Sequence, residues 1–173
     1  MNIFNRLLAD VKGAVALEFS LVSIPFFALV LCAIQAFVVF FFEQTLQVAA
    51  SQAARQLMVG QSQTQGLSQD QFKSLVCSNL PTVFDCGNVM VDVQTAGSYA
   101  TLNTAPIVLT YGPNGVITNV WSYDPGAAGS VVIVRVLYNW PIVGGKFTQS
   151  FSNQINGSIL MVGTAVVKNE PFS

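Results

Sequence analysis

The chain contains no histidine, and only 9% of its 173 residues are charged. Serine and cysteine catalytic triads and imidazole metal sites all depend on histidine, so the sequence excludes the conventional form of each. Asp85, Asp92 and Asp124 lie in separate segments, which does not favour the paired carboxylates of acid–base catalysis. We therefore expect no enzyme activity, no cofactor, no bound metal and no small-molecule substrate.

Positive charge is also scarce. The seven Lys and Arg residues are scattered along the chain, and the formal net charge is −1. A nucleic-acid-binding surface needs clustered Lys and Arg to displace the counterions of the phosphates. We therefore expect no nucleic-acid partner.

Charge is absent altogether from residues 19–42, where Phe, Leu, Ile and Val dominate. A helix of about 24 residues extends about 36 Å, against about 30 Å for the hydrocarbon core of a bilayer. The sequence therefore predicts one transmembrane span over about 19–42, bent at Pro25. A secretory signal has a shorter apolar core of about 7–15 residues, so cleavage near residues 48–50 is not expected.

The residues on either side of the span predict its orientation. Arg6 and Lys12 precede it, whereas Glu43 follows it and the next cation is Arg55. Positively charged residues stay preferentially on the cytoplasmic side of a membrane. We therefore expect residues 1–13 to form a cytoplasmic leader and residues 61–173 to be exported.

The chain has only three cysteines. Cys77 and Cys86 fall in the exported part, where two thiols so close in sequence favour a disulfide. Closing so short a loop stabilises by about 2–3 kcal/mol in the chain-entropy account. A zinc site is the less favoured alternative, because the chain has neither histidine nor a second cysteine pair. Cys32, inside the span, serves most simply as a small apolar side chain.

The helical pattern continues past the predicted span. Residues 43–58 contain no Gly or Pro, and Gly60 supplies a stop, so we expect one helix over 14–60, about 70 Å long. One face of it is apolar and can contact either the helices of other subunits or the sheet of its own domain. This apolar stripe consists of Leu46, Ala49, Ala50, Ala53, Ala54 and Leu57.

Residues 61–173 predict a small α+β domain. After a polar linker at 61–66, Ser68 and Gln71 form a capping box that opens a short helix, which ends before Pro81. Beyond Cys86 the apolar residues alternate with a period of two, which predicts antiparallel strands packed on the C-terminal half of the long helix. The predicted strands are 89–93, 116–121, 131–140 and 155–167.

Two features of this sheet leave alternatives open. Arg135, in the most apolar strand, either pairs with Asp92 across the sheet, faces solvent at an edge, or serves a ligand. Tyr138, Trp140 and Trp121 are expected in the core in preference to a platform for a ligand.

Gly13, Glu18 and Phe19 carry a resemblance to class III type IV prepilins. In those proteins the leader ends in Gly, and a Glu lies five residues into the mature chain with an aromatic residue after it. The Ala-rich, Arg-bearing residues 49–55 and the ending 165–172, which reads Ala-Val-Val-Lys-Asn-Glu-Pro-Phe, extend the likeness. With these segments the chain resembles TadE-like pseudopilins of the tight-adherence (Flp) type IV pilus.

The resemblance implies that a prepilin peptidase cuts between Gly13 and Ala14. It also implies a bacterial inner-membrane protein with a cytoplasmic N-terminus and a periplasmic domain, incorporated in a pilus or its base. Its partners would be that peptidase, membrane lipid, and the other pilins and pseudopilins of the assembly.

The position of Glu18 can be interpreted without the family. An ionisable group just inside a membrane is disfavoured unless it finds a partner. Cleavage after Gly13 leaves an ammonium on Ala14, and pairing between Glu18 of one subunit and that ammonium on a neighbour would set their axial register. The alternative is that Glu18 simply reaches the headgroup boundary, where its cost is small.

The length of the exported part favours a minor pseudopilin. Major Flp pilins are little more than one helix, and TadG-like proteins carry a much larger exported region. A TadF-like pseudopilin remains open, as does a signal-anchored periplasmic domain that binds a ligand or partner and has no part in a pilus. Retention of residues 1–13 in the mature chain would favour the anchored domain.

Overall fold

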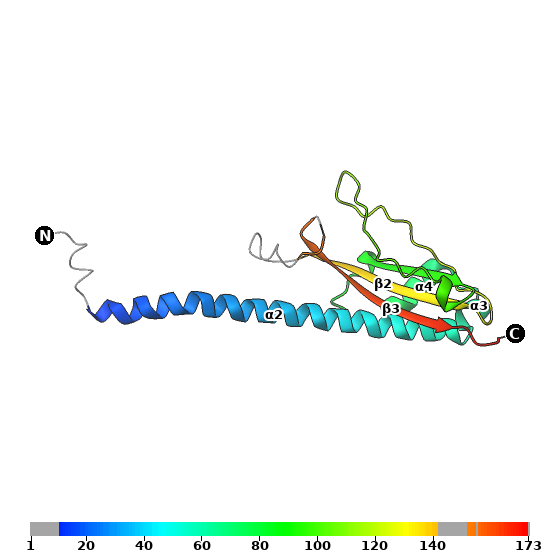
Figure 1. Cartoon of the computed structure of the whole chain (residues 1–173), viewed down its shortest axis with the longest axis horizontal. Coiled ribbons are helices and arrows are strands. Elements are labelled where there is room, and N and C mark those ends of the chain that lie inside the picture. The colour runs from blue at the N-terminus through cyan, green and yellow to red at the C-terminus, as the bar shows by residue number, and fades with distance from the viewer. Residues whose placement is uncertain (1–10, 142–151, 155, 173) are drawn as a thin grey trace. The chain divides into compact units, whose positions relative to one another are not determined.

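The computed structural model describes residues 11–141, 152–154 and 156–172, with side chains from Val15 onward (Figure 1). The chain divides into two compact units, Met1–Phe41 and Phe42–Ser173. Helices and an antiparallel sheet confirm the predicted α+β class. In chain order the elements are α2 (Val11–Met58), α3 (Gln61–Thr64), α4 (Gln69–Ser78), η1 (Cys86–Asn88), β1 (Val89–Ala96), η2 (Tyr99–Thr101), β2 (Val131–Pro141) and β3 (Ser158–Lys168).

Helix α2 is continuous and ends close to its predicted stop. Met58 is its last residue, and Gly60 follows in the left-handed region at φ 74°, a conformation that favours glycine. The predicted linker at 61–66 is wrong in part, because it contains the short helix α3. Tertiary contacts hold that turn: the Gln63 Nε2 donates to the carbonyls of Leu57, at 3.2 Å, and Pro125, at 2.7 Å.

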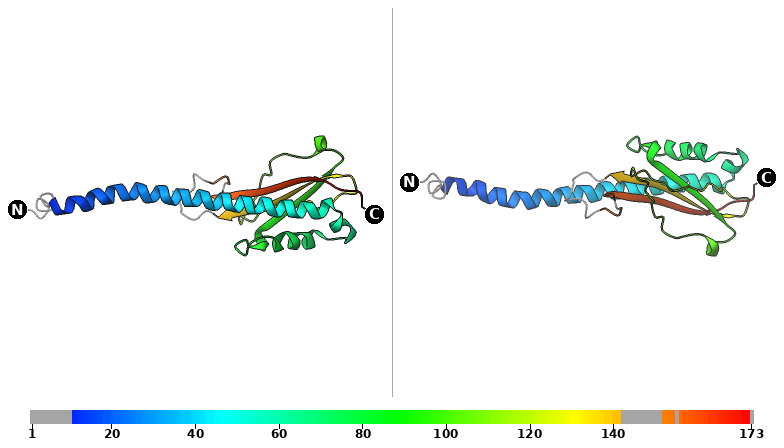
Figure 2. Two further views of the ribbon diagram at one scale, coloured as in Figure 1. Left: turned by 90° about the horizontal axis from the view of Figure 1, so that it is seen from below. Right: turned by 90° about the horizontal axis from the view of Figure 1, so that it is seen from above.

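The apolar stripe of α2 faces the sheet of its own domain. All six of its residues are 0% exposed, and the C-terminal part of α2 lies with α4 on one face of the sheet (Figure 2). Gly163 of β3 lies directly against α2, where an added Cβ would collide with the Leu46 carbonyl. The sequence left two contacts open for this stripe, the helices of other subunits and the sheet of its own domain. The sheet of its own domain is the one observed.

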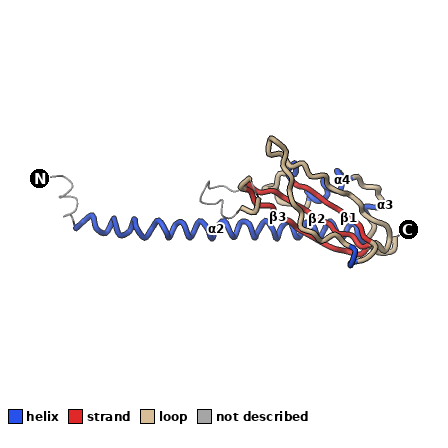
Figure 3. Tube along the Cα trace, turned by 45° about the horizontal axis from the view of Figure 1, so that its top comes forward, coloured by secondary structure: helices blue, strands red, loops and turns tan. Residues whose placement is uncertain are grey.

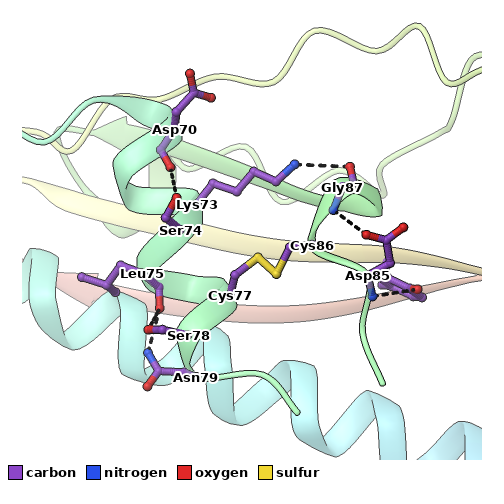
Figure 4. Close-up of a disulfide and its surroundings, with 11 residues drawn as sticks. Asp70, Lys73, Ser74, Leu75, Cys77, Ser78, Asn79, Asp85, Cys86 and Gly87 are labelled. Carbon is purple, nitrogen blue, oxygen red and sulfur yellow. Dashed lines mark hydrogen bonds between the residues drawn. A yellow bond between two sulfur atoms is a disulfide. The ribbon is translucent and has the colours of Figure 1, made fainter. Parts of the chain in front are cut away.

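Helix α4 begins at the predicted capping box and carries the predicted disulfide. The Ser68 hydroxyl accepts from the Gln71 backbone N–H at 3.3 Å, and the Gln71 Oε1 accepts from the Ser68 N–H at 2.8 Å. Cys77 near the end of α4 is bonded to Cys86 of η1, with a Cα–Cα distance of 5.9 Å (Figure 4). The disulfide therefore ties α4 to the start of β1.

The sheet has the order β1-β2-β3, with both pairs antiparallel. β2 is central, which explains why its predicted segment is almost uniformly apolar: Val131 to Tyr138 are all buried. β3 begins at Ser158, later than predicted, because Gly157 with φ 76° forms a turn before it.

The predicted strand at 116–121 is wrong. This segment makes only one isolated antiparallel bridge, between Tyr111 and Ile117. Val116 is 65% exposed and Val120 95%, so the alternation that suggested a strand buries neither of them. The segment belongs to the long loop between β1 and β2, which lies over the other face of the sheet (Figure 3).

An ion pair holds this loop against the sheet. Arg135 and Asp92 are register partners on β2 and β1, with 3.5 Å between Nη1 and Oδ2 and both side chains buried. The Arg135 guanidinium also donates to the Asn103 carbonyl, and Asp92 Oδ1 accepts from the Ser122 N–H at 3.0 Å. Of the three alternatives for Arg135, cross-strand pairing is therefore the one observed, and both ends of the loop are fastened to this pair.

The aromatic residues of the sheet lie in packed clusters. The Tyr138 ring is 5.0 Å from that of Phe84, and the Trp140 ring is 4.5 Å from that of Phe42, measured between centroids. Trp121, on the opposite face, packs half-buried against a cluster of Met90, Leu109, Leu137 and Leu160. Tyr138 is core as predicted, whereas Trp140 and Trp121 keep part of their surface exposed.

Candidate functional site

The first unit presents an exposed apolar helix. Within Val15–Met58 the described part of the chain contains one helix long and apolar enough to cross a membrane, and none of its most apolar stretch is buried. Phe19 is 72% exposed and Leu21 75%. A helix surface of this composition is stable against lipid chains or against similar helices, which makes α2 suitable as a membrane anchor.

Two serine hydroxyls of this helix are hydrogen-bonded to the helix's own backbone. The Ser20 hydroxyl donates to the Ala16 carbonyl, and the Ser23 hydroxyl donates to the Ser20 carbonyl at 3.1 Å. Pro25 lies inside α2 without ending it. An unsatisfied polar group in hydrocarbon costs several kcal/mol, so these bonds lower the cost of placing serine in a membrane. The Cys32 thiol is free and exposed.

The predicted processing and register residues all lie at the start of α2. Gly13 and Ala14 fall in the part whose backbone alone is described, and Glu18 and Phe19 follow with exposed side chains. Residues four apart in a helix rise about 6 Å along its axis and share a face. The helix therefore places Ala14 and Glu18 about one turn apart. Cys77 and Cys86 belong to the second unit.

The ending that contributed to the resemblance fastens the second unit. Asn169 is 2% exposed, and its Nδ2 donates to the carbonyls of Pro125, at 2.9 Å, and Ala127, at 3.1 Å. The Glu170 N–H donates to the Met58 carbonyl at 2.8 Å, at the end of α2. We call residues 168–172 the C-terminal clasp, because they join the last turn of α2 to the loop before β2.

One residue with a specific contact was not singled out by the sequence. Gln47 lies on the polar side of α2, yet its side-chain amide bonds the backbone of β3 at Thr164. Its Nε2 donates to the Thr164 carbonyl at 2.7 Å, and its Oε1 accepts from the Thr164 N–H at 3.0 Å. This pair imitates a neighbouring strand and occupies part of the open edge of β3. The helical pattern contains no signal for it, because Gln on that face is expected simply to be solvated.

The described residues bring together no three His, Cys, Asp or Glu side chains that could hold a metal ion. The buried Asp92 carboxylate already accepts hydrogen bonds from Gln94, at 2.8 Å, and Ser122 in addition to its pairing with Arg135. Its arrangement is that of a structural ion pair, with its oxygens engaged by the fold.

Comparison with known proteins identifies the N-terminal segment. The family model for TadE-like proteins matches residues 13–55, beginning at Gly13 and extending through Glu18 and the alanines of the apolar stripe. The predicted resemblance to TadE-like proteins is confirmed over this segment. Curated proteins and solved structures gave no match to the chain.

Proposed function

We propose that this chain is a minor pseudopilin that takes part in assembly of a tight-adherence (Tad) pilus. Its TadE-like segment supports a role related to that pilus. The exposed apolar helix carries this proposal, because a helix of this kind packs among similar helices in a membrane or a fibre. The second unit, with its closed core and disulfide, would be the exported part that contacts other subunits.

Processing by a prepilin peptidase between Gly13 and Ala14 is part of the proposal. Both residues are helical in the uncleaved chain, so the helix has to open locally before a protease can reach the peptide bond. Glycine weakens a helix interior by about 1 kcal/mol relative to alanine and leaves the scissile bond unshielded. Gly13 therefore favours cleavage at this place.

Cleavage would create the partner that Glu18 needs. The new ammonium on Ala14 lies about one turn from Glu18 in the same helix, and in a stack of such helices it can reach Glu18 of a neighbour. Pairing removes an isolated charge from an apolar environment and fixes the axial position of one subunit against the next. The proposed orientation places this end at the cytoplasmic side of the inner membrane and the second unit in the periplasm.

The first test is the N-terminal sequence of the protein recovered from membranes of its native host, determined by mass spectrometry. We expect a mature chain that begins at Ala14. A chain that still begins at Met1 would contradict processing, and a periplasmic domain on a simple anchor, with a ligand or partner outside any pilus, would then be the better account.

Two substitutions separate processing from assembly. Gly13→Val should leave the chain at full length, because a branched side chain blocks the scissile bond. Glu18→Ala should be cleaved normally but enter sheared pilus fractions at least about tenfold less, the equivalent of about 1.4 kcal/mol of lost pairing. Glu43→Ala, at the next carboxylate, is the control and should be incorporated normally. Normal incorporation of Glu18→Ala would contradict the register role.

A further inference from the structure

A cavity of about 590 Å³ lies where β1 begins, β2 ends and β3 begins. The loop residues 115–117 and Trp121 also line it, and it remains partly open to solvent. Its volume is in the range of about 300–1,000 Å³ that is usual for small-molecule sites. Every element that forms it belongs to the second unit, and the proposed assembly role uses none of it.

The described lining of this cavity is neutral. It includes Asn88, Asn139, Asn156 and Trp121, and it contains no Asp, Glu, Lys or Arg among the described residues. An ionised ligand would lose water there without gaining an opposite charge, which costs several kcal/mol. The lining therefore favours an uncharged ligand with many hydrogen-bonding groups.

Ser158 fixes the orientation of two of these amides. Its side chain is buried, and its hydroxyl donates to the Asn139 Oδ1 at 2.6 Å. The Asn156 Oδ1 accepts from the Ser158 backbone N–H at 3.2 Å. The hydroxyl has a single proton, which holds the Asn139 oxygen, while the backbone N–H of Ser158 holds the Asn156 oxygen. The Nδ2 groups of Asn139 and Asn156 then enter no hydrogen bond in the part of the chain that the structure describes. Two oriented amide donors are thus left for a ligand.

Trp121 supplies the apolar part of the site. The indole packs on the core cluster that includes Met90 and Leu137, which holds the ring in place while part of its surface remains exposed. Its Nε1–H is likewise unused by any hydrogen bond between described residues. An indole offers a broad apolar face with a polar edge, so it suits a ring compound that has an apolar side and polar substituents.

We propose that this cavity binds a neutral sugar residue of a glycan. Amide groups donate to and accept from hydroxyls, and an aromatic face covers the C–H side of a pyranose ring. A pyranose also carries no charge, as the lining requires. The exported unit of this protein therefore has a saccharide-binding site in addition to its role in assembly.

The test uses the full-length chain purified in a detergent without a sugar headgroup, because glycosidic detergents would compete. The probes are four neutral linear tetrasaccharides, made of glucose, galactose, mannose or N-acetylglucosamine, with tetragalacturonate and tetraglycine as charged and peptide comparisons. Binding is measured by isothermal titration calorimetry and by saturation-transfer NMR. We expect at least one neutral tetrasaccharide to bind with a Kd of about 1 mM or tighter, and neither comparison probe to bind.

Two matched pairs of variants locate the binding. Val116→Arg places a long side chain in the cavity and should weaken binding at least about tenfold, whereas Val108→Arg, at an exposed valine of the same loop outside the cavity, should not. Asn156→Asp keeps the oxygen that Ser158 holds but removes the donor, so it should weaken binding similarly. Its control is Asn103→Asp, whose Oδ1 caps its own turn by accepting from the Ala105 N–H at 3.1 Å.

Three outcomes would overturn the proposal. They are failure of all four neutral tetrasaccharides to bind, equal or tighter binding of tetragalacturonate or tetraglycine, and unchanged sugar binding by both Val116→Arg and Asn156→Asp. Circular dichroism of each variant establishes that it is folded, and the two pairs act through different side chains, so misfolding of one leaves the other decisive.

Discussion

At the scale of the residue, some buried polar groups of the second unit have hydrogen-bond or ion-pair partners and others have none in the described structure. Asp92 has a partner for each oxygen, and together with Arg135 it fastens the long loop. The Tyr123 hydroxyl is the contrast, because it is buried without a hydrogen-bond partner in the described structure. Its ring packs on Phe72 at 5.4 Å between centroids. Burial raises the pKa of the Tyr123 phenol above 10.0, because the charged form is poorly solvated there.

We predict that Tyr123→Phe keeps or raises the stability of the protein, by up to about 1 kcal/mol. The substitution retains the ring contact with Phe72 and removes a hydroxyl that lost its water without gaining a partner. Because the folded-state pKa is raised, the wild type also loses stability as the pH rises above 10.0, and the variant should lose less. Urea unfolding at neutral and alkaline pH measures both effects. A loss of stability greater than about 1 kcal/mol at neutral pH would show that the hydroxyl has a partner.

At the scale of the element, the second unit depends on close packing between α2 and β3. Gly163 leaves no room for a side chain, since a Cβ there would meet the backbone of Leu46 and lie 2.7 Å from the Gln47 nitrogen. Immediately beside it, the Gln47 side chain bonds the β3 backbone at Thr164. The atoms of α2 that a Cβ at position 163 would meet belong to the backbone of Leu46 and Gln47, so they cannot move aside by a change of rotamer.

Gly163→Ala should therefore destabilise the second unit by about 1–3 kcal/mol, because α2 has to move away from the sheet. Gly97→Ala is the matched control, since a Cβ at Gly97 meets no atom within 4 Å. Thermal unfolding followed by near-ultraviolet circular dichroism compares the two. Equal stability of both variants would mean that α2 and β3 adjust their separation freely.

At the scale of the whole second unit, the C-terminal clasp joins segments far apart in the sequence. Asn169 reaches the carbonyls of Pro125 and Ala127, and Glu170 reaches the end of α2 at Met58. Phe172 lies against Gly60, where any Cβ would overlap its ring. The Gln63 amide also donates to the Pro125 carbonyl, so α3 enters the same network. The ending of the described chain therefore has a structural role in the second unit.

Asn169→Ala should lower the stability of the second unit by about 1–3 kcal/mol, because it leaves two carbonyls of the loop without their donor. Asn169→Asp should cost at least as much, since a carboxylate cannot donate and faces carbonyl oxygens. Glu170→Ala is the control, because Glu170 contributes through its backbone N–H and its side chain is exposed. Unfolding midpoints in urea measure all three. Wild-type stability of Asn169→Asp would contradict the clasp.

The parts of the fold that the sequence predicted are those with local or periodic causes. The apolar stripe of α2 has a helical period, the capping box needs only Ser68 and Gln71, and the alternation and apolarity of β1 and β2 report burial. The TadE-like segment was likewise predictable, because Gly13, Glu18 and Phe19 lie within one short stretch of the sequence, and their spacing can be read without knowledge of the fold. At residues 116–121 the alternation of apolar and polar residues did not suffice to predict a strand correctly, because this segment forms only one isolated bridge in the described structure.

The chemistry of α2 was determined by the sequence itself: an uncharged run long enough for a bilayer, with one carboxylate near its start. Only the tertiary structure decided that Gly163 faces Leu46, that Asn169 holds the loop before β2, and that Asn139, Asn156 and Trp121 line one cavity. The physical reason for this division is that the periodicity and composition of a segment indicate which of its faces is buried. They do not state which distant segment buries it, because that depends on how all the elements pack at once.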